Sequence, residues 1–432
     1  MAKDFHGDLI KMQLRSNIRL DSYKNRLKPT TFISRFFCCL ALFIATSSIS
    51  NAHAGTLEQA KQLHDRLTGV SASEITLLEM MILLDENKPI EAAYKAMETP
   101  AFYSTTLKLF ATPSTNIDQD IFAPLNDYSA TLIGLVRDDV DFREILQADI
   151  LYVGKSSLGL PAYSISNNAH YQALEDQFID LSDALERTSQ SSLSGLPATA
   201  TAGVLTSRAA AKEFFYLGTN RAMVRFTLMN HLCTDLEPLK DTTRSPDRIR
   251  QDVSRSPGGD SRLFLNNCLG CHSGMDPLAQ AFAYYEYNFN SETDPTGESG
   301  SLSYNQQGQT DPTTGTRVQS KYHNNATTFP YGFVTQDDQW QNYWREGVNQ
   351  KLGWDENLSG KGVGAKSLGQ EFANSQAFAH CQVKKVFNTV CLRDAESDDD
   401  LAQISSTTES FKQNDYQLKR VFAEVGEYCM GE

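Results

Sequence analysis

The stretch Asn-Asn-Cys-Leu-Gly-Cys-His-Ser-Gly-Met-Asp-Pro-Leu occupies residues 266–278 of the chain. Cys268 and Cys271 are three positions apart, and His272 follows directly. Side chains at this spacing lie on one face of a helical turn, so both thiols can reach the two vinyl groups on one side of a porphyrin. The imidazole of His272 then faces the iron as its proximal ligand. The Cys-x-x-Cys-His pattern predicts one covalent haem c, bound by Cys268, Cys271 and His272, with His272 as the metal ligand.

Three other interpretations of the two cysteines are weaker. A thioredoxin-like redox pair belongs to a βαβ unit, whereas residues 258–265 resemble the start of a helix after a glycine-rich turn. A zinc site needs a second ligand pair at matched spacing, and Cys381 and Cys391 have nine residues between them. A structural disulfide would not require the histidine. A single motif also argues against di-haem peroxidases and multihaem proteins, in which a second haem relays electrons.

Residues around the motif also fit a haem. Gly270 keeps the turn between the cysteines small, so that the ring can lie against the backbone. Five arginines precede or enter the motif region in an otherwise acidic chain, and a guanidinium pairs a carboxylate in bidentate fashion. We therefore expect some of them to hold the haem propionates, with a solvated basic loop as the alternative for each. They are Arg244, Arg248, Arg250, Arg255 and Arg262.

The first 54 residues predict an export signal. They carry eight basic and three acidic side chains, then the apolar run 36–49, and then Asn51-Ala52-His53-Ala54. A basic segment, a short apolar core and an A-x-A site are the parts of a secretory signal peptide. The apolar run is shorter than the roughly 20 residues that span a bilayer, so an uncleaved anchor is the weaker alternative. We expect cleavage after Ala54 and a periplasmic mature chain with no transmembrane segment.

The charge of the chain limits its partners. The formal net charge is −14 at pH 7, and loss of the eight basic and three acidic leader residues brings it to about −19. Such a surface repels nucleic acid and anionic lipid headgroups. We therefore expect no nucleic-acid partner and expect the partners to be other periplasmic redox proteins. The oligomeric state is left open.

Apolar periodicity predicts a mainly α fold, without alternating strands of any length. The length allows two or three domains. We expect the signal peptide at 1–54, a helical N-terminal domain at 55–200, a monohaem cytochrome c-like domain at 201–290, an irregular loop-rich insert at 291–364 and a C-terminal helical region at 365–432.

Several elements are predicted in more detail. Leu57, Ala60, Leu63, His64 and Leu67 fall on one face of a helix, and Ser73 can cap a helix over 74–85. The other predictions are an amphipathic helix over 168–188 with Leu174, Phe178, Leu181 and Leu185 buried, a linker or exposed loop over 189–203, a long helix or helix pair over 207–233, a helix that starts at Pro277, a polar surface loop over 290–328, and a short helix over 338–350 that Asp338 could cap.

The oxidising compartment favours two disulfides among Cys233, Cys381, Cys391 and Cys429. The stretch from Cys381 to Cys391 predicts one continuous helix, which separates these two residues by about 15 Å. A disulfide needs Cα atoms within about 7 Å, so this pair is excluded. Two pairings remain: 233–381 with 391–429, or 233–391 with 381–429. We favour the first, because an antiparallel return would bring the ends of the last helices, Cys391 and Cys429, together.

Several stretches together resemble the planctomycete-type cytochrome c family, which is assembled from neighbouring domains of unknown function. The resemblance covers about residues 140–432 and implies a haem-binding periplasmic electron carrier or a component of a haem oxidoreductase, with no substrate specified. This sequence differs from the family pattern after Pro277, where Ala279-Gln280-Ala281-Phe282 replaces a usual Gly-Phe pair, and in its polar loop 290–328. The stretches are 141–146, 148–153, 203–206, Thr219-Asn220-Arg221, the haem motif with Met275-Asp276-Pro277-Leu278, and 378–387.

Electron transfer through the covalent haem is the function that the sequence favours. About 270 residues exceed what a monohaem shuttle domain of roughly 100 residues requires, so two alternatives stay open. One is a haem oxidoreductase that acts on peroxide or a small substrate at an open distal face, and the other is a docking subunit of a periplasmic redox complex. No catalytic group stands out in the sequence, which makes an electron carrier or redox-complex component the better interpretation than a stand-alone enzyme.

The distal ligand of the iron cannot be read from the sequence. His323 is favoured among the candidates because it lies downstream of the haem helix in a segment that could fold back over the ring. Met229 or no protein ligand are the alternatives kept. The weaker candidates are His231, His380, Met223 and Met275, for which an ordinary core or surface role is expected.

Overall fold

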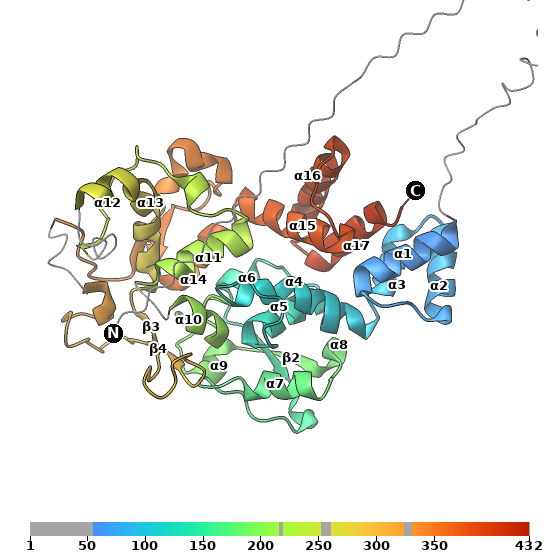
Figure 1. Cartoon of the computed structure of the whole chain (residues 1–432), viewed down its shortest axis with the longest axis horizontal. Helices are drawn as coiled ribbons and strands as arrows, with labels where there is room; N and C mark the ends of the chain where they lie inside the picture. The colour runs from blue at the N-terminus through green and yellow to red at the C-terminus, as the bar shows by residue number, and fades with distance from the viewer. Residues whose placement is uncertain (1–54, 216–218, 252–260, 324–330, 432) are drawn as a thin grey trace, which may run out of the picture. The chain divides into compact units, whose positions relative to one another are not determined.

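The fold is described from a computed structural model, which describes residues 55–215, 219–251, 261–323 and 331–431 (Figure 1). The predicted signal peptide lies outside these ranges. The chain is mainly α-helical, as predicted. The helices are α1 (Thr56–Thr68), α2 (Glu74–Asp85), α3 (Pro89–Ala96), α4 (Lys108–Ala111), α5 (Asp127–Arg137), α6 (Glu144–Gln147), α7 (Ala169–Asp176), α8 (Leu181–Ala184), α9 (Gln190–Ser194), α10 (Arg208–Phe214), α11 (Arg221–Leu232), α12 (Ser261–Asn267), α13 (Leu269–Ala279), α14 (Gly364–Ala373), α15 (Gln376–Cys391), α16 (Asp398–Gln413) and α17 (Leu418–Cys429).

The strands of the described residues are short and form two-stranded antiparallel sheets. Each strand has three or four residues, so the sheets act as local ribbons between helices and do not form a separate layer. The pairs are β1 (Leu151–Gly154) with β2 (Leu185–Thr188), β3 (Tyr285–Asn288) with β4 (Ser301–Tyr304), and β5 (Gln339–Gln341) with β6 (Lys361–Val363).

The first helices form where the apolar pattern predicted them. Ala60, Leu63 and Leu67 of α1 are buried, and α1 ends at Gly69, whose φ of 71° suits a residue without Cβ. The Ser73 side chain accepts a hydrogen bond from the backbone N–H of Thr76, which confirms the predicted cap of α2.

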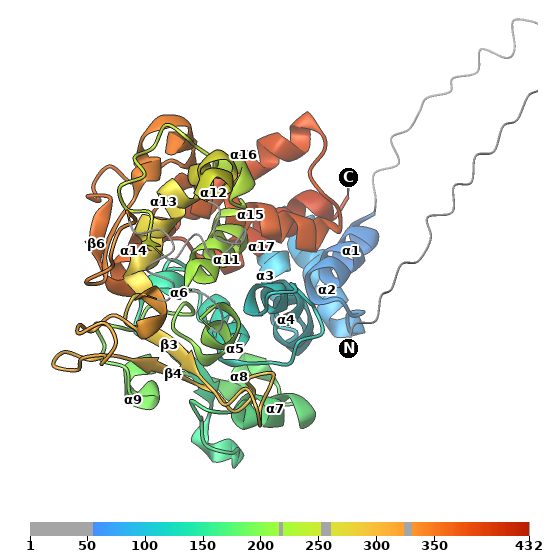
Figure 2. The same ribbon diagram turned by 60° about the vertical axis from the view of Figure 1, so that its left-hand side comes forward.

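The last helices pack against the first ones. Helix α17 contacts α1 and α3, and it lies beside them in both views (Figures 1 and 2). The Phe422 ring of α17 lies 5.2 Å from Phe102 and 5.5 Å from Phe110, both edge-on. Because one apolar cluster runs from Ala60 to Val425, the regions at the two ends share a core. The predicted boundaries at 200, 290 and 364 stay predictions.

Both favoured disulfides are present. Cys233 bonds Cys381 and Cys391 bonds Cys429, with Cα–Cα distances of 5.2 and 5.5 Å. Helix α15 is continuous from Gln376 to Cys391, which is the geometry that excluded a 381–391 bond. The prediction of this pairing is confirmed.

The prediction of one continuous helix over 168–188 is wrong, although Leu174, Leu181 and Leu185 of its predicted stripe are buried. Helix α7 ends at Asp176, and Phe178 has φ 51° and is 93% exposed, although it was assigned to the buried stripe. The chain restarts as α8, where the Asp180 side chain caps the backbone N–H of Ser182. Residues 185–188 then pair with β1 as strand β2. Pairing with a strand more than 30 positions earlier overrides the helical periodicity of the segment.

The segment 189–203, predicted as a linker or exposed loop, is exposed at 192–193, 195 and 198–199 but buried at 200–203. It contains α9, and Gln190 is fully buried: its amide donates to the Gly203 carbonyl and accepts from the Thr206 hydroxyl. Gly203 has φ 52°, and a Cβ there would meet the Ile145 carbonyl oxygen at 2.1 Å. A buried glutamine that satisfies the backbone lets this polar stretch enter the core.

Three predictions near the haem motif are also corrected. Pro277 lies inside α13 and does not start a new helix. Residues 338–350 form strand β5 and the 3-10 turns Tyr343–Arg345 and Gly347–Leu352, and Asn342, not Asp338, caps the first turn. The loop 290–328 contains β4 and the 3-10 turn Ser320–His323, with Val318 and Tyr322 buried; its residues 324–328 lie outside the described ranges. Val318 and Tyr322 belong to a small buried apolar cluster with Ala283 and Tyr284, which draws this polar segment inward.

The predictions for 207–233 and 365–432 agree with the structure. Helices α10 and α11 form the expected pair, and α14 to α17 fill the C-terminal region. No helix in the described part of the chain is both long and apolar enough to cross a membrane.

Candidate functional site

Helix α13 positions the predicted haem residues. Cys268 is the residue before its first turn, and Cys271 and His272 lie within that turn. The opposite side of the helix is held close to its neighbours by glycines. A Cβ on Gly270 would meet Lys240 Cγ at 2.6 Å, and a Cβ on Gly274 would meet the Trp344 indole at 2.1 Å. Gly270 therefore has a packing role toward residues 240–242, in addition to the role predicted for it beside the haem.

The two motif cysteines differ from the other described cysteines. Cys268 and Cys271 are half-buried and outside any disulfide, whereas the remaining four are bonded in pairs. Burial raises the pKa of the Cys271 thiol, and the charge of Glu237 adds to the rise. Redox-active thiols have a lowered pKa, and helix α12 precedes the motif where a thioredoxin-like unit has a strand. Both observations weigh against the redox-pair interpretation.

His272 is held by a carboxylate of its own helix. Its Nδ1 lies 2.9 Å from Oδ1 of Asp276, four residues later and one turn along. Since a carboxylate only accepts, Nδ1 is the donor of this bond, and Nε2 is the ring nitrogen left to ligate an iron. The Phe264 ring lies 5.2 Å from the imidazole in an edge contact. Phe264 and Ile249 form a small apolar cluster beside Cys268.

Asp276 is fully buried and paired by an arginine of the neighbouring helix. Arg221 donates from Nε at 2.6 Å and from Nη2 at 3.0 Å to the two carboxylate oxygens. Burial alone would raise the pKa of Asp276, but the charges of Arg221 and His272 and their hydrogen bonds hold it well below its usual range. The ion pair with Arg221 therefore favours the ionised form of this carboxyl group.

Further contacts hold Arg221 and Asp276 in place. The backbone N–H of Arg250 lies 3.3 Å from Asp276 Oδ2, and the Arg250 side chain donates to Thr219, which also accepts from Arg221. The guanidinium of Arg250 lies 4.5 Å from the centre of the Tyr322 ring, and the Tyr322 hydroxyl donates to the Ala279 carbonyl at the end of α13. These contacts join three segments around the carboxylate that orients His272.

The roles of Asp276 and Arg221 are not among the roles predicted from the sequence. The signal for Asp276 was available, because residues at i and i+4 of a helix face each other. No spacing rule links Arg221 to a residue 55 positions later; only the packing of α11 against α13 does so.

The arginines predicted to hold propionates have different environments. Arg244 lies near Asp241 and Glu346, at 3.2 and 2.8 Å. Arg248 donates to Gln280 and to the Gln339 carbonyl, and Arg250 is buried beside Asp276. Arg262 is exposed on α12, and Arg255 lies outside the described residues. Three of these arginines thus already bond protein groups: Arg244, Arg248 and Arg250. That arginines near the motif hold the haem propionates stays a prediction.

The candidates for the distal ligand of the iron differ in burial and in the hydrogen bonds that they form. His231 is buried, with Nε2 2.7 Å from the Tyr128 hydroxyl, and burial holds its pKa well below the usual value. Met223 and Met275 are buried in the main core, and His380 is exposed on α15. His323 bonds the Thr335 carbonyl through Nε2 at 2.8 Å, which leaves Nδ1. Met229 is half-buried. His323, Met229 or no ligand therefore stay the open choices.

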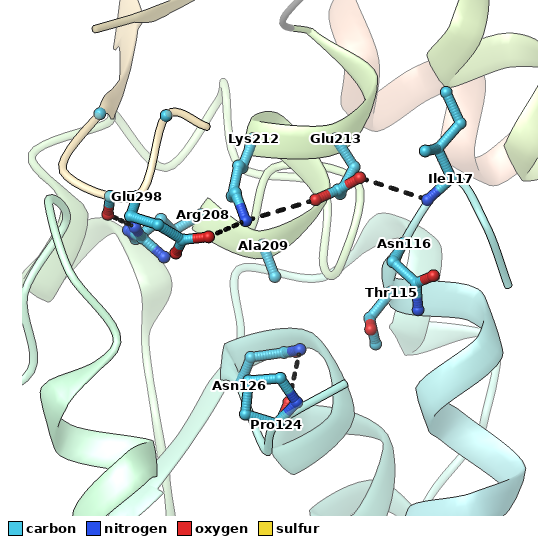
Figure 3. Close-up of polar contacts among 12 residues, drawn as sticks. Thr115, Asn116, Ile117, Pro124, Asn126, Arg208, Ala209, Lys212, Glu213 and Glu298 are labelled. Carbon is cyan, nitrogen blue, oxygen red and sulfur yellow. Dashed lines mark hydrogen bonds and ion pairs between the residues drawn. The ribbon is translucent and has the colours of Figure 1, made fainter. Parts of the chain in front are cut away.

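A separate polar cavity of about 180 Å³ lies beside α10 (Figure 3). Lys212 lies 2.6 Å from Glu298 and 3.5 Å from Glu213, and Glu213 accepts from the backbone N–H of Ile117. The amides of Asn116 and Asn126 donate to backbone carbonyls. These groups bond one another and the backbone, which gives them a structural role.

Within the described ranges, no three His, Cys, Asp or Glu side chains gather closely enough to hold a metal ion. Comparisons of the chain with models of protein families, with curated proteins and with solved structures found no match.

Proposed function

We propose that the chain is an exported monohaem c-type cytochrome that transfers electrons. The haem would be attached through Cys268 and Cys271, with Nε2 of His272 as the iron ligand. The observation that carries the proposal is the state of these residues: two thiols outside any disulfide at haem spacing, followed by an imidazole whose other nitrogen is bonded to a buried carboxylate. Metal-binding histidines usually donate their second ring N–H in this way.

The donor set fits a haem better than a bare metal ion. A porphyrin supplies four of the iron ligands itself, so one protein imidazole suffices on the proximal side. When bound, the haem supplies one-electron redox chemistry. The chain would contribute the fixed tautomer of His272, and Asp276 and Arg221 keep its ring oriented. The apolar side chains of Phe264 and Ile249 would exclude water beside Cys268.

The periplasm is the proposed compartment. Two disulfides are formed in the described part of the chain, and structural disulfides persist in oxidising compartments. The basic and apolar leader supplies the route of export. Membership of the planctomycete-type cytochrome c family is proposed on the same motifs that carry the resemblance, and other periplasmic redox proteins are the proposed partners.

Optical spectra and intact mass together test the proposal. The mature chain, made in a host that attaches haem c, should have the mass of residues 55–432 plus one haem. Its reduced spectrum should show the sharp bands of a six-coordinate low-spin haem that does not bind carbon monoxide. A mass without haem would contradict the proposal.

A second function is favoured by one contact, the bond between His272 and Asp276. A carboxylate partner makes the imidazole a stronger electron donor, which suits an iron that reacts with peroxide or a small substrate at an open distal face. A five-coordinate high-spin spectrum with rapid carbon monoxide binding would favour this oxidoreductase over the electron carrier. The docking-subunit alternative would give the low-spin spectrum together with a stable complex with a redox partner.

The Asp276→Asn variant should have a higher haem reduction potential than the wild type. Asparagine can still accept from Nδ1 of His272, but the negative charge that stabilises ferric iron is lost. Loss of a group that orients a metal ligand commonly lowers metal affinity by a factor of ten to a hundred. Applied to the ferric state of the haem relative to the ferrous state, this factor corresponds to a rise in reduction potential of roughly 60–120 mV for one electron. Redox titration followed in the visible spectrum measures the shift.

The matched control for this variant is Asp183→Asn, which removes an exposed carboxylate on α8. It should leave the potential unchanged. Equal potentials for Asp276→Asn and the wild type, at equal haem content, would show that Asp276 does not act on the iron ligand.

A further inference from the structure

A cavity of about 390 Å³ is lined by residues of the β3–β4 ribbon, of the loop after it and of the start of α14. Figure 2 shows where these elements lie in the fold. Its volume falls at the lower end of the range of about 300–1,000 Å³ for small-molecule sites. Residues from six segments of the chain line it. They include Tyr285, Tyr304, Gln306, Gln307, Arg317 and Asp338.

Two tyrosines give the cavity an aromatic wall. The rings of Tyr285 and Tyr304 lie 4.8 Å apart. The Tyr285 hydroxyl donates to the Ala200 carbonyl, and the Tyr304 hydroxyl accepts from Arg317 Nη2 at 2.9 Å. Each ring is therefore anchored at its polar end, so the wall is rigid. Such a ring presents an apolar face with a polar tip. The half-buried Tyr304 offers that face to the cavity, whereas Tyr285 is only 1% exposed and supports it from behind.

The positive charge of the cavity is also fixed. Arg317 donates through Nε and Nη2 to the Asn305 carbonyl, at 3.0 and 2.9 Å. Its guanidinium carbon lies 4.0 Å from the centre of the Tyr284 ring. Because its donors already bond the Asn305 carbonyl and the Tyr304 hydroxyl, Arg317 does not require a ligand as a bonding partner. Its charge still repels a cationic ligand.

Asp338 supplies a carboxyl group that is only 6% exposed. Among the described residues, no basic side chain forms an ion pair with it. Burial raises the pKa of Asp338 to about 6, although the Arg317 charge and the Tyr284 hydroxyl oppose the rise. A carboxylate has about four acceptor positions, and buried polar groups normally have partners. This carboxyl therefore has bonding capacity left for a ligand in the cavity.

The charges select the class of ligand. Arg317 disfavours a cation and Asp338 disfavours an anion, while the exposed side chains of Gln306 and Gln307 offer both donors and acceptors. A ligand without net charge is therefore favoured. Because Gln306 and Gln307 are uncharged donors and acceptors, they match hydroxyl groups on it, and Tyr304 can support an apolar face. From this lining we infer that the cavity binds a neutral saccharide. The inference does not depend on the proposed haem.

Saturation-transfer NMR with the mature full-length chain tests the site. The probes are glucose and galactose, the amino sugars glucosamine and galactosamine, and glucuronate and galacturonate, which share the ring shapes but differ in charge. At least one neutral hexose should receive saturation and should bind more tightly than its charged counterparts. The Asp338→Asn variant should bind it at least tenfold more weakly, since one buried hydrogen-bonding charge is lost.

The control variant is Asp337→Asn, which removes the neighbouring carboxylate that does not line the cavity, and it should bind as the wild type does. Tighter binding of an amino sugar or a uronate than of the hexoses would overturn the assignment of a neutral ligand. Absence of transfer to all six sugars would overturn the site, and so would equal binding by Asp338→Asn. Far-ultraviolet circular dichroism checks that each variant is folded.

Discussion

The double variant Cys268→Ala with Cys271→Ala is expected to carry no haem after acid-acetone extraction. Each thiol would form one thioether bond, and without both bonds only the His272–iron contact and packing remain. The wild type should keep its haem through the same extraction. Each single variant should keep the haem through one bond, at lower yield. Pyridine haemochrome spectra and intact mass measure the covalent fraction.

A matched control removes the same number of cysteines elsewhere. Cys391→Ala with Cys429→Ala deletes a disulfide between α15 and α17 and should leave covalent haem in place. Retention of extraction-resistant haem by the Cys268→Ala, Cys271→Ala variant would contradict the assignment of these two cysteines as the haem attachment site. A wild-type chain with a Cys268–Cys271 disulfide and no added mass would instead support the redox-pair interpretation.

Loss of the Cys233–Cys381 disulfide is expected to lower the free energy of unfolding, and to lower it by more than loss of the Cys391–Cys429 disulfide does. Cys233 follows the last residue of α11, the helix that carries Arg221, and Cys381 lies in α15. The bond closes a loop across 148 positions, whereas Cys391–Cys429 spans 38. In the chain-entropy model these loops correspond to about 5 and about 4 kcal/mol, and measured effects are usually nearer 2–4 kcal/mol.

The test compares denaturant unfolding of two serine variants. Cys233→Ser with Cys381→Ser should lower the unfolding free energy by roughly 2–5 kcal/mol, and by more than Cys391→Ser with Cys429→Ser does. Equal unfolding midpoints for wild type and the first variant would contradict the expectation. Wild type treated with reductant should approach the behaviour of the variants, which separates the effect of the bond from that of the substituted side chains.

The local features of this protein were determined by the sequence alone. The spacing of Cys268, Cys271 and His272 falls within one helical turn, so their common placement on α13 needed no other part of the chain. The cap at Ser73 and the buried stripe of α1 follow from neighbouring residues in the same way. For the disulfides, the rise of one continuous helix excluded a bond between Cys381 and Cys391 and left two pairings. The expected antiparallel return of the last helices then favoured the pairing that formed.

Features that join distant segments were decided only by the tertiary structure. The helical pattern over 168–188 failed at Phe178 because residues 185–188 pair with β1. Asp338 was expected to cap a helix and instead lies in a cavity between β4 and α14. Arg221 reaches Asp276 because α11 packs against α13. Helical periodicity and caps depend on interactions within one or two turns of the chain. These contacts depend instead on which distant surfaces pack together, and the spacing of neighbouring residues does not determine that packing.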